Sequence, residues 1–289
     1  MTVLLGAVAY DPKVVTIWDG FRAWLRGPGG LDFDFVLYSN YERQVTDLVG
    51  GRVDVAWNSP LAWVRARRLA AARGVPLTPV TMRDTDCDLR SVIVVRADSP
   101  VRALTDLAGR VVAAGAVDSP QATLLPLSLL RSAGLVPEGD VTVRRFDVGV
   151  GLHGDHIGGE RDAARALFAA DAADRVDAAC MTDSNLLLFG REGVLPAGSV
   201  RVAAQTPAYD HCTMTAGPAA ASNADTARFG KLLLGMDYAD PALRPLLDLE
   251  GLKEWRPPRL SGYAPLERAV DEAGFYDAAG EITAADYRP

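Results

Sequence analysis

The chain has 289 residues, of which 49% are hydrophobic and 23% charged, and this balance excludes a disordered or fibrous protein. Its formal charge of −7 excludes the basic surface of a nucleic-acid-binding protein, so no nucleic-acid partner is expected. No apolar run approaches the ~20 residues of a membrane-spanning helix, so no membrane insertion is expected. The three cysteines are widely spaced and form no CxxC pair, which argues against a disulfide framework and a thiolate zinc site.

The first part of the chain alternates predicted strands with predicted helices. Apolar residues recur at helical spacing between short apolar runs, and glycine-rich turns separate the segments. We predict strands at residues 3–8, 33–38, 53–57 and 75–82, and helices at residues 14–25, 42–49 and 60–73. This β-α-β-α-β order is typical of a parallel sheet with helices on both faces.

The alternation restarts after a polar segment at residues 84–90. We predict strands at 91–96, 110–114, 141–146, 176–181 and 200–204, and helices at 120–133, 160–170, 226–236 and 241–247. A loop rich in glycine and histidine, residues 148–159, lies between two of these elements.

Two sets of strands and helices predict two α/β lobes, each a mostly parallel sheet flanked by helices. We expect residues 1–90 and 210–289 to form a discontinuous first lobe and residues 97–200 to form the second. The crossings between the lobes are expected near residues 91–96 and 201–212. Sheets of this kind bind ligands at the carboxyl ends of their strands, so a ligand is expected in the cleft between the lobes.

The N-terminus lacks the features of an export signal. Residues 3–8 begin at once as a strand, without a basic region, an apolar helix and a small-residue cleavage site. As written, the sequence predicts a cytoplasmic protein. A signal peptide trimmed from the chain would instead make the protein periplasmic or extracellular.

Five sequence passages, spread from about residue 3 to 268, carry a shared pattern. They are NYE at 40–42 with VGGRVDVA at 49–56, DS at 98–99 with LTDLAGRVVA at 104–113, DSPQA at 118–122, RVDAA at 175–179, and EGL at 250–252 with GYAPL at 262–266. In their order and spacing these passages resemble the phosphonate-type periplasmic substrate-binding proteins of ABC transporters. The resemblance implies the type II, transferrin-like binding-protein fold and a small polar, anionic ligand. It also implies a transporter permease as partner, but only if the protein is exported.

The pattern departs from that family at the ligand turn, where the family has an S-T-S-G sequence. Here Pro120 removes one backbone N–H group, and Asp118 places a negative charge beside the turn. Both changes disfavour a dianionic phosphonate, which a helix N-terminus with free N–H groups would otherwise bind.

Polar and aromatic residues at the expected carboxyl ends of strands are candidate ligand contacts. Several of them have an alternative role, since serine before proline is a typical helix cap and a single tyrosine can simply pack at a lobe surface. The candidates, including those that the resemblance implies, are Tyr10, Tyr41, Asn58, Ser59, Ser119, Gln121, Thr123, Asp183 and Tyr209.

All three histidines, His153, His156 and His211, fall in segments expected to border the cleft. The resemblance implies that His153 or His156 contacts the ligand. Asp155 between them suggests a metal site, but histidines at i and i+3 without a third ligand are a weak pattern. Hydrogen bonding is therefore favoured over metal binding, and no metal or cofactor is expected.

The sequence Asp210-His211-Cys212 suggests a cysteine nucleophile with a histidine base. Adjacent residues of an extended segment point to opposite faces, so His211 is not expected to deprotonate Cys212. A productive pair would need Cys212 to face His153 or His156 across the cleft.

Two functions remain. A solute-binding module that closes over a small polar metabolite is favoured by the resemblance. The alternative is a cytoplasmic enzyme on the same scaffold, in a biosynthetic pathway, that eliminates from or hydrolyses a small acid. Its catalytic residues would be His211 and His153 as general acid and base, with Asp183.

Overall fold

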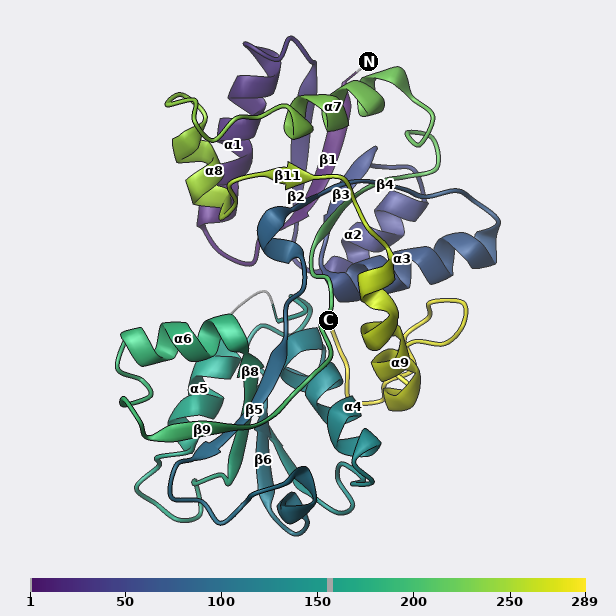
Figure 1. Ribbon diagram of the computed structural model, residues 1–289. Coiled ribbons are helices and arrows are strands. Elements are labelled where there is room, and N and C mark those ends of the chain that lie inside the picture. Colours follow the sequence, from purple (N-terminus) through teal and green to yellow (C-terminus); the bar gives the residue numbers. More distant parts are fainter. Residues whose placement is uncertain (1, 155–157) are drawn as a thin grey trace.

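The computed structural model describes residues 2–154 and 158–289. Within this part, the chain forms two α/β lobes, one above the other in Figure 1, each built on its own sheet. The first sheet has the strand order β11-β4-β10-β3-β1-β2, and the second has the order β7-β6-β8-β5-β9. The predicted two-lobed α/β fold is therefore confirmed.

The first lobe combines segments from both ends of the chain. Its strands are β1 (Val3–Val8), β2 (Phe33–Tyr38), β3 (Val55–Asn58), β4 (Thr78–Arg83), β10 (Thr213–Ala216) and β11 (Trp255–Arg256). Its helices are α1 (Lys13–Arg26), α2 (Tyr41–Val49), α3 (Pro60–Arg73), α7 (Ala224–Leu234) and α8 (Arg244–Glu250), with α9 (Ala264–Ala273) beside them.

The second lobe comes from the middle of the chain. Its strands are β5 (Ser91–Arg96), β6 (Val111–Ala114), β7 (Thr142–Arg145), β8 (Ala178–Thr182) and β9 (Val200–Gln205). A π-helical turn, η3 (Pro120–Leu124), continues into α4 (Leu125–Ser132), and the lobe also holds α5 (Gly158–Ala166) and α6 (Asp183–Arg191). Three short 3-10 turns complete the described elements: η1 (Asp84–Asp86) between β4 and β5, η2 (Leu104–Leu107) between β5 and β6, and η4 (Ser261–Tyr263) between β11 and α9.

Both sheets are mixed, where the sequence predicted mostly parallel sheets. β1 pairs in parallel with β2 and β3, but β10 runs antiparallel between β3 and β4. In the second sheet β6 is parallel to β7 and β8, whereas β5 is antiparallel to β8 and β9. The antiparallel pairs arise because each crossing of the chain enters or leaves a sheet through a strand that runs against its neighbours.

The first crossing precedes the range predicted for it, and the second lies within its predicted range but is shorter. Residues 91–96 form β5, an internal strand of the second sheet, and residues 200–205 form β9 beside it. The chain passes between the sheets at residues 84–90 and 206–212. There Leu89 and Tyr209 exchange two backbone hydrogen bonds of 2.9 Å. The β-branched residues of 91–96 predicted a strand correctly, but periodicity does not say which sheet a strand joins.

The C-terminal residues contact both lobes, where the sequence predicted that they complete the first. Figure 1 shows α9, in yellow, beside α4 of the second lobe. One buried hydrophobic cluster joins α3, η3, α4 and the C-terminal segment, and it includes Leu61, Val64, Leu124, Leu125, Leu266, Phe275, Tyr276 and Tyr287. The C-terminal segment therefore straps the two lobes together on one side of the molecule.

Local sequence signals place the helices that border the cleft. The Ser59 hydroxyl accepts the Ala62 N–H at 3.1 Å, with Pro60 in the first turn of α3, as the Ser-Pro pair predicts. Gly74 ends the same helix in the left-handed conformation at φ 64°. Ser119 caps η3 in the same manner, since its hydroxyl accepts the Ala122 N–H.

Gly262 lies against a buried carboxylate at the crossing, and we expect Gly262→Ala to destabilise the protein. A Cβ atom there would lie well inside van der Waals contact of the Asp210 carboxylate, which is held by Arg259. Overpacking of this kind costs about 1–3 kcal/mol. Urea denaturation measures the change in the free energy of unfolding.

Gly190→Ala is the matched control, because nothing lies within 4 Å of a Cβ atom at this position in α6. Alanine is the better helix former by about 0.5–1 kcal/mol, so this variant should be slightly more stable than the parent. Equal stability of the two variants would contradict the packing argument.

Candidate functional site

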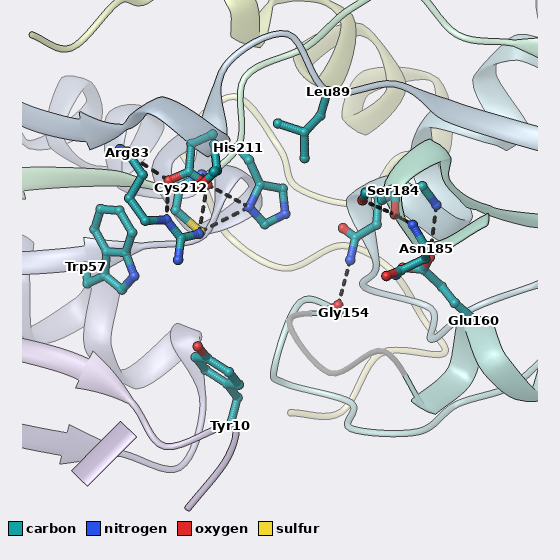
Figure 2. Close-up of a pocket in the computed structure, with 14 residues that line it drawn as sticks. Tyr10, Trp57, Arg83, Leu89, Gly154, Glu160, Ser184, Asn185, His211 and Cys212 are labelled. Atoms are coloured by element: carbon teal, nitrogen blue, oxygen red, sulfur yellow. Dashed lines mark hydrogen bonds and ion pairs between the residues drawn. The ribbon is translucent and has the colours of Figure 1, made fainter. Parts of the chain in front are cut away.

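A cavity of about 200 Å³ lies between the two lobes (Figure 2). The first lobe contributes Tyr10, Trp57 and Arg83, and the two crossings contribute Asp86, His211 and Cys212. The second lobe contributes Gln121, Gly154, Glu160, Thr182, Ser184 and Asn185, and the first crossing adds Thr85 and Leu89. The predicted position of a ligand site between the lobes therefore coincides with a cavity.

Arg83, the last residue of β4, is the charged residue that the first lobe contributes to the cavity wall. Its Nε and Nη2 donate to the two carboxylate oxygens of Asp86 at 2.6 and 2.9 Å. Its Nη1 donates to the Glu250 carboxylate at 3.2 Å, and the guanidinium lies 5.1 Å from the ring centroid of Trp57. The positive charge of Arg83 is thus compensated by two carboxylates.

Asp86 is the centre of this wall. Burial alone would raise the pKa of its carboxyl group, but Arg83 and His211 outweigh burial and hold the pKa well below its usual range. The backbone N–H groups of His211 and Cys212 donate to the Asp86 carbonyl at 2.8 Å and to its carboxylate at 3.2 Å, respectively. Asp86 therefore remains ionised and fixes the second crossing in place.

The side chains of His211 and Cys212 do not point to opposite faces, which was the reason for expecting that His211 would not deprotonate Cys212. His211 Nδ1 lies 3.1 Å from Cys212 Sγ and 3.4 Å from an Asp86 carboxylate oxygen. The alternation rule fails here because residues 210–212 precede β10 and are not part of a regular strand. Three side chains with different chemistry consequently meet at the floor of the cavity.

The wall formed by the second lobe centres on Glu160 in the first turn of α5. Glu160 is only 3% exposed, and one carboxylate oxygen accepts the Thr182 N–H at 2.9 Å and the Asn185 amide at 2.8 Å. Its Oε1 has no hydrogen-bond partner among the residues that the structure describes. Burial raises the pKa of this carboxyl group.

The N-terminus of α6 also borders the cavity. Thr182 caps this helix by accepting the Asn185 N–H at 3.1 Å, and Ser184 and Asn185 of its first turn line the cavity. Helix N-termini attract anions through their free N–H groups and the helix dipole. Gln121 of η3 lies nearby and donates to the Gly154 carbonyl at 2.6 Å, while its own Oε1 is unpaired within the described chain.

Three of the predicted ligand contacts, Tyr10, Gln121 and His211, line the cavity. The sequence analysis missed Glu160, Asn185 and Arg83. A signal for Glu160 existed, because it is the first acidic residue of a helix that follows the Gly- and His-rich loop.

Three other predicted residues, His153, Tyr41 and Ser59, meet in a buried network next to the cavity rather than in its lining. The His153 ring stacks on Tyr41 with the centroids 4.8 Å apart, and its Nδ1 lies 2.7 Å from Ser59 Oγ. Its Nε2 lies 3.1 Å from the Glu42 carboxylate, which also forms an ion pair with Arg65 at 2.8 Å. His153 belongs to the second lobe and the other four residues to the first, so the network spans the lobes.

The remaining predicted residues that the structure describes form hydrogen bonds within the protein and do not line the cavity. These bonds join Asn58 to Gln44, Ser119 to Ala122, Thr123 to Ala116, Asp183 to Ser184 and Tyr209 to Ser91. His156, with the neighbouring Asp155, lies outside the described residues.

Two mixed α/β lobes that enclose a small polar cavity define a two-lobed binding protein of the type II periplasmic class. A family model described as "ABC transporter, phosphonate, periplasmic substrate-binding protein" matches residues 7–263. The chain belongs to this family. The resemblance found in the sequence is thereby confirmed.

Solved structures share the fold at low sequence identity. PhnD1 from Prochlorococcus marinus, in complex with methylphosphonate, is 19% identical with a TM-score of 0.68, over 94% of this chain and 98% of its own. XAC2383 from Xanthomonas citri, bound to ATP, is 19% identical with a TM-score of 0.68, over 94% of this chain and 97% of its own. The aliphatic sulphonate binding protein SsuA from Escherichia coli is 18% identical with a TM-score of 0.54, over 94% of this chain and 90% of its own. No curated protein matches the sequence.

No helix in residues 2–154 and 158–289 is long and apolar enough to cross a membrane. The family description is that of a periplasmic component, and the comparisons give no support to the cytoplasmic location that the sequence predicted.

Replacing Glu160 or Glu42 by glutamine should change the free energy of unfolding at neutral to alkaline pH in opposite directions. The pKa of Glu160 is raised from 4.5 on folding, so the folded state holds this proton more tightly and stability is lost as pH rises above the ordinary value. Glu160→Gln should therefore raise the free energy of unfolding at about pH 8 and change it little at about pH 4.

Glu42 has the opposite shift. Burial would raise the pKa of Glu42, but His153 and Arg65 outweigh it and the pKa falls below 4.5. The stabilisation that ionised Glu42 gives the folded state is therefore fully present above pH 4.5 and is lost as the pH falls through the lowered pKa. Glu42→Gln should cost about 3–5 kcal/mol near neutral pH, since it breaks a buried ion pair, and less in acid. Urea denaturation across pH tests both variants, and shifts of the same sign would contradict the assignment.

Proposed function

We propose that this protein binds a small phosphonate or sulfonate that also carries a hydrogen-bond donor, such as an amine or a hydroxyl group. It would do so in the periplasm, as the solute-binding component of an ABC importer. The observation that carries the proposal is that the cavity combines a helix N-terminus with two buried acceptor oxygens that have no hydrogen-bond partner in residues 2–154 and 158–289.

The N-terminus of α6 supports binding of an acidic group. Ser184 and Asn185 line the cavity in the first turn of this helix, where the helix dipole favours an anion, although their N–H groups already donate to Asp183 and Thr182. The family membership supports the same conclusion, as do the relatives that bind methylphosphonate or aliphatic sulphonates.

The two unpaired oxygens support a donor group on the same ligand. Glu160 Oε1 and Gln121 Oε1 are buried at the cavity wall, and a buried acceptor without a hydrogen bond costs about 1–3 kcal/mol. An amine or hydroxyl group of the ligand would satisfy both. A simple dianion would instead approach Glu160, Asp86 and an already compensated Arg83, which agrees with the departure from the S-T-S-G turn.

The cavity volume supports a ligand of few atoms. At about 200 Å³ it lies below the roughly 300–1,000 Å³ that is typical of sites for drug-sized ligands. A permease of an ABC transporter is the partner that the family implies.

Thermal-shift assays with methylphosphonate, 2-aminoethylphosphonate, methanesulfonate, taurine and propionate test the ligand class. A ligand at about 100 times its Kd should stabilise the protein by about 2.7 kcal/mol. We expect the amine-bearing phosphonate or sulfonate to stabilise the protein more than its plain counterpart. Equal or greater stabilisation by the plain acids would contradict the role assigned to Glu160 and Gln121.

Asn185→Asp tests the position of the site. The new carboxylate would face both the acidic ligand and Glu160, so we expect at least a ~10-fold loss of affinity by calorimetry, which corresponds to about 1.4 kcal/mol. Asn223→Asp is the matched control, because Asn223 caps α7 away from the cavity and aspartate caps a helix equally well. Unchanged affinity in Asn185→Asp would place the ligand elsewhere.

A further inference from the structure

Asp86, His211 and Cys212 bring together the three side-chain types that bind zinc. One ligand atom from each residue lies within 4.8 Å of the others, in the part of the chain that the structure describes. Figure 2 shows His211 and Cys212 side by side, near Arg83, on one side of the cavity. Thiolate, imidazole and carboxylate groups together favour Zn²⁺ over harder cations such as Mg²⁺ or Ca²⁺.

The distances between these atoms are close to those of a tetrahedral zinc site. The separation of His211 Nδ1 from Cys212 Sγ is 3.1 Å, and from the Asp86 oxygen it is 3.4 Å. Zinc bonds of about 2.3 Å to sulfur and about 2.0–2.1 Å to nitrogen and oxygen give tetrahedral edges of roughly 3.5 and 3.4 Å. These two separations thus lie within a few tenths of an ångström of tetrahedral edges, and the Asp86 oxygen lies within 4.8 Å of Cys212 Sγ.

The surrounding charges also favour a divalent cation. With Cys212 as a thiolate, two carboxylates and the Arg83 guanidinium leave an excess of two negative charges in this cluster. Arg83 donates to both carboxylate oxygens of Asp86 and the Cys212 N–H donates to Oδ1, so these hydrogen bonds fix the orientation of the carboxylate. Such outer contacts orient the ligands of metal sites.

We propose that Asp86, His211 and Cys212 bind a divalent thiophilic cation, with Zn²⁺ preferred, at the floor of the cavity. The cation bonds to Asp86 Oδ1, His211 Nδ1 and Cys212 Sγ. Cys212 releases its thiol proton to solvent, and neutral His211 keeps its proton on Nε2. The fourth position faces the cavity, where water or an acidic ligand completes the coordination.

The site would also supply positive charge to the cavity, whose arginine is already compensated. This consequence rests on the proposed function, because it concerns the binding of an acidic ligand. The proposed metal site is independent of the proposed function, since the cation binds to side chains of the protein alone. The experiment below therefore uses the metal without any organic ligand.

Titration of the full, reduced chain with Co²⁺ tests the proposal, because cobalt replaces zinc in such sites and its thiolate complexes absorb in the near ultraviolet. We expect a sulfur-to-cobalt charge-transfer band, visible bands typical of tetrahedral cobalt, and loss of both on addition of Zn²⁺. Cys212→Ser should remove the charge-transfer band and weaken Co²⁺ binding by at least ~100-fold, since even the loss of an outer contact costs 10–100-fold.

Cys87→Ser is the matched control. Cys87 lies in the first crossing near the site, but its Sγ contacts the Arg83 carbonyl at 3.7 Å and does not line the cavity. This variant should keep the band. His211→Gln is a second test, which should weaken Co²⁺ binding while a thiolate band remains at high cobalt concentration.

Absence of a charge-transfer band in the parent protein with excess Co²⁺ would overturn the proposal, whatever the variants show. A band that survives Cys212→Ser, or that disappears in Cys87→Ser, would also overturn it. A thermal melt without metal checks that each variant is folded. Failure of the ligand screen alone would leave the cobalt result unaffected, so the two proposals fail separately.

Discussion

The insertion of His153 into the first lobe is the contact on which the arrangement of the two lobes depends. A loop of the second lobe places this ring against Tyr41, Ser59 and Glu42, with no exposure to solvent. Glu42 holds the C-terminal segment as well, since it accepts hydrogen bonds from Tyr276 and Tyr287 at 2.5 and 3.0 Å. Charged and polar groups at this depth are tolerated only when they are paired, so the network is stable only while the lobes are together.

The shape of the cavity follows from the same contact. Gly154, the residue after His153, forms part of the cavity wall and accepts a hydrogen bond from Gln121. The Gly151 carbonyl accepts the Tyr41 N–H across the lobes at 3.0 Å. Separation of the lobes would therefore break the contacts of His153 with the first lobe and, at the same time, move the loop that carries Gly154 away from the cavity. A ligand that bridges the walls would stabilise the closed arrangement by its preference for that state.

The one arginine that lines the cavity, Arg83, is paired with two carboxylates of the protein, so it offers little free positive charge to a ligand. Arg83 is matched by Asp86 and Glu250, so it acts chiefly to fix the position of Asp86. Attraction for an acid then rests on the N-terminus of α6 and on any cation bound at His211 and Cys212. On the opposite wall, burial raises the pKa of the Glu160 carboxyl group.

The sequence by itself determined most of the elements, the caps of two helices and the family, but it did not predict β10, β11, α6 and α9. Ser59-Pro60 and Ser119-Pro120 begin their helices as predicted, because capping depends only on residues within one turn. The tertiary structure alone decided which polar residues face the ligand. His153 turned inward, because its partner Ser59 lies 94 residues away in the chain, while Glu160 came to the cavity through Thr182 and Asn185. Periodicity gives the face of an element, but only the packing of distant segments decides what that face meets.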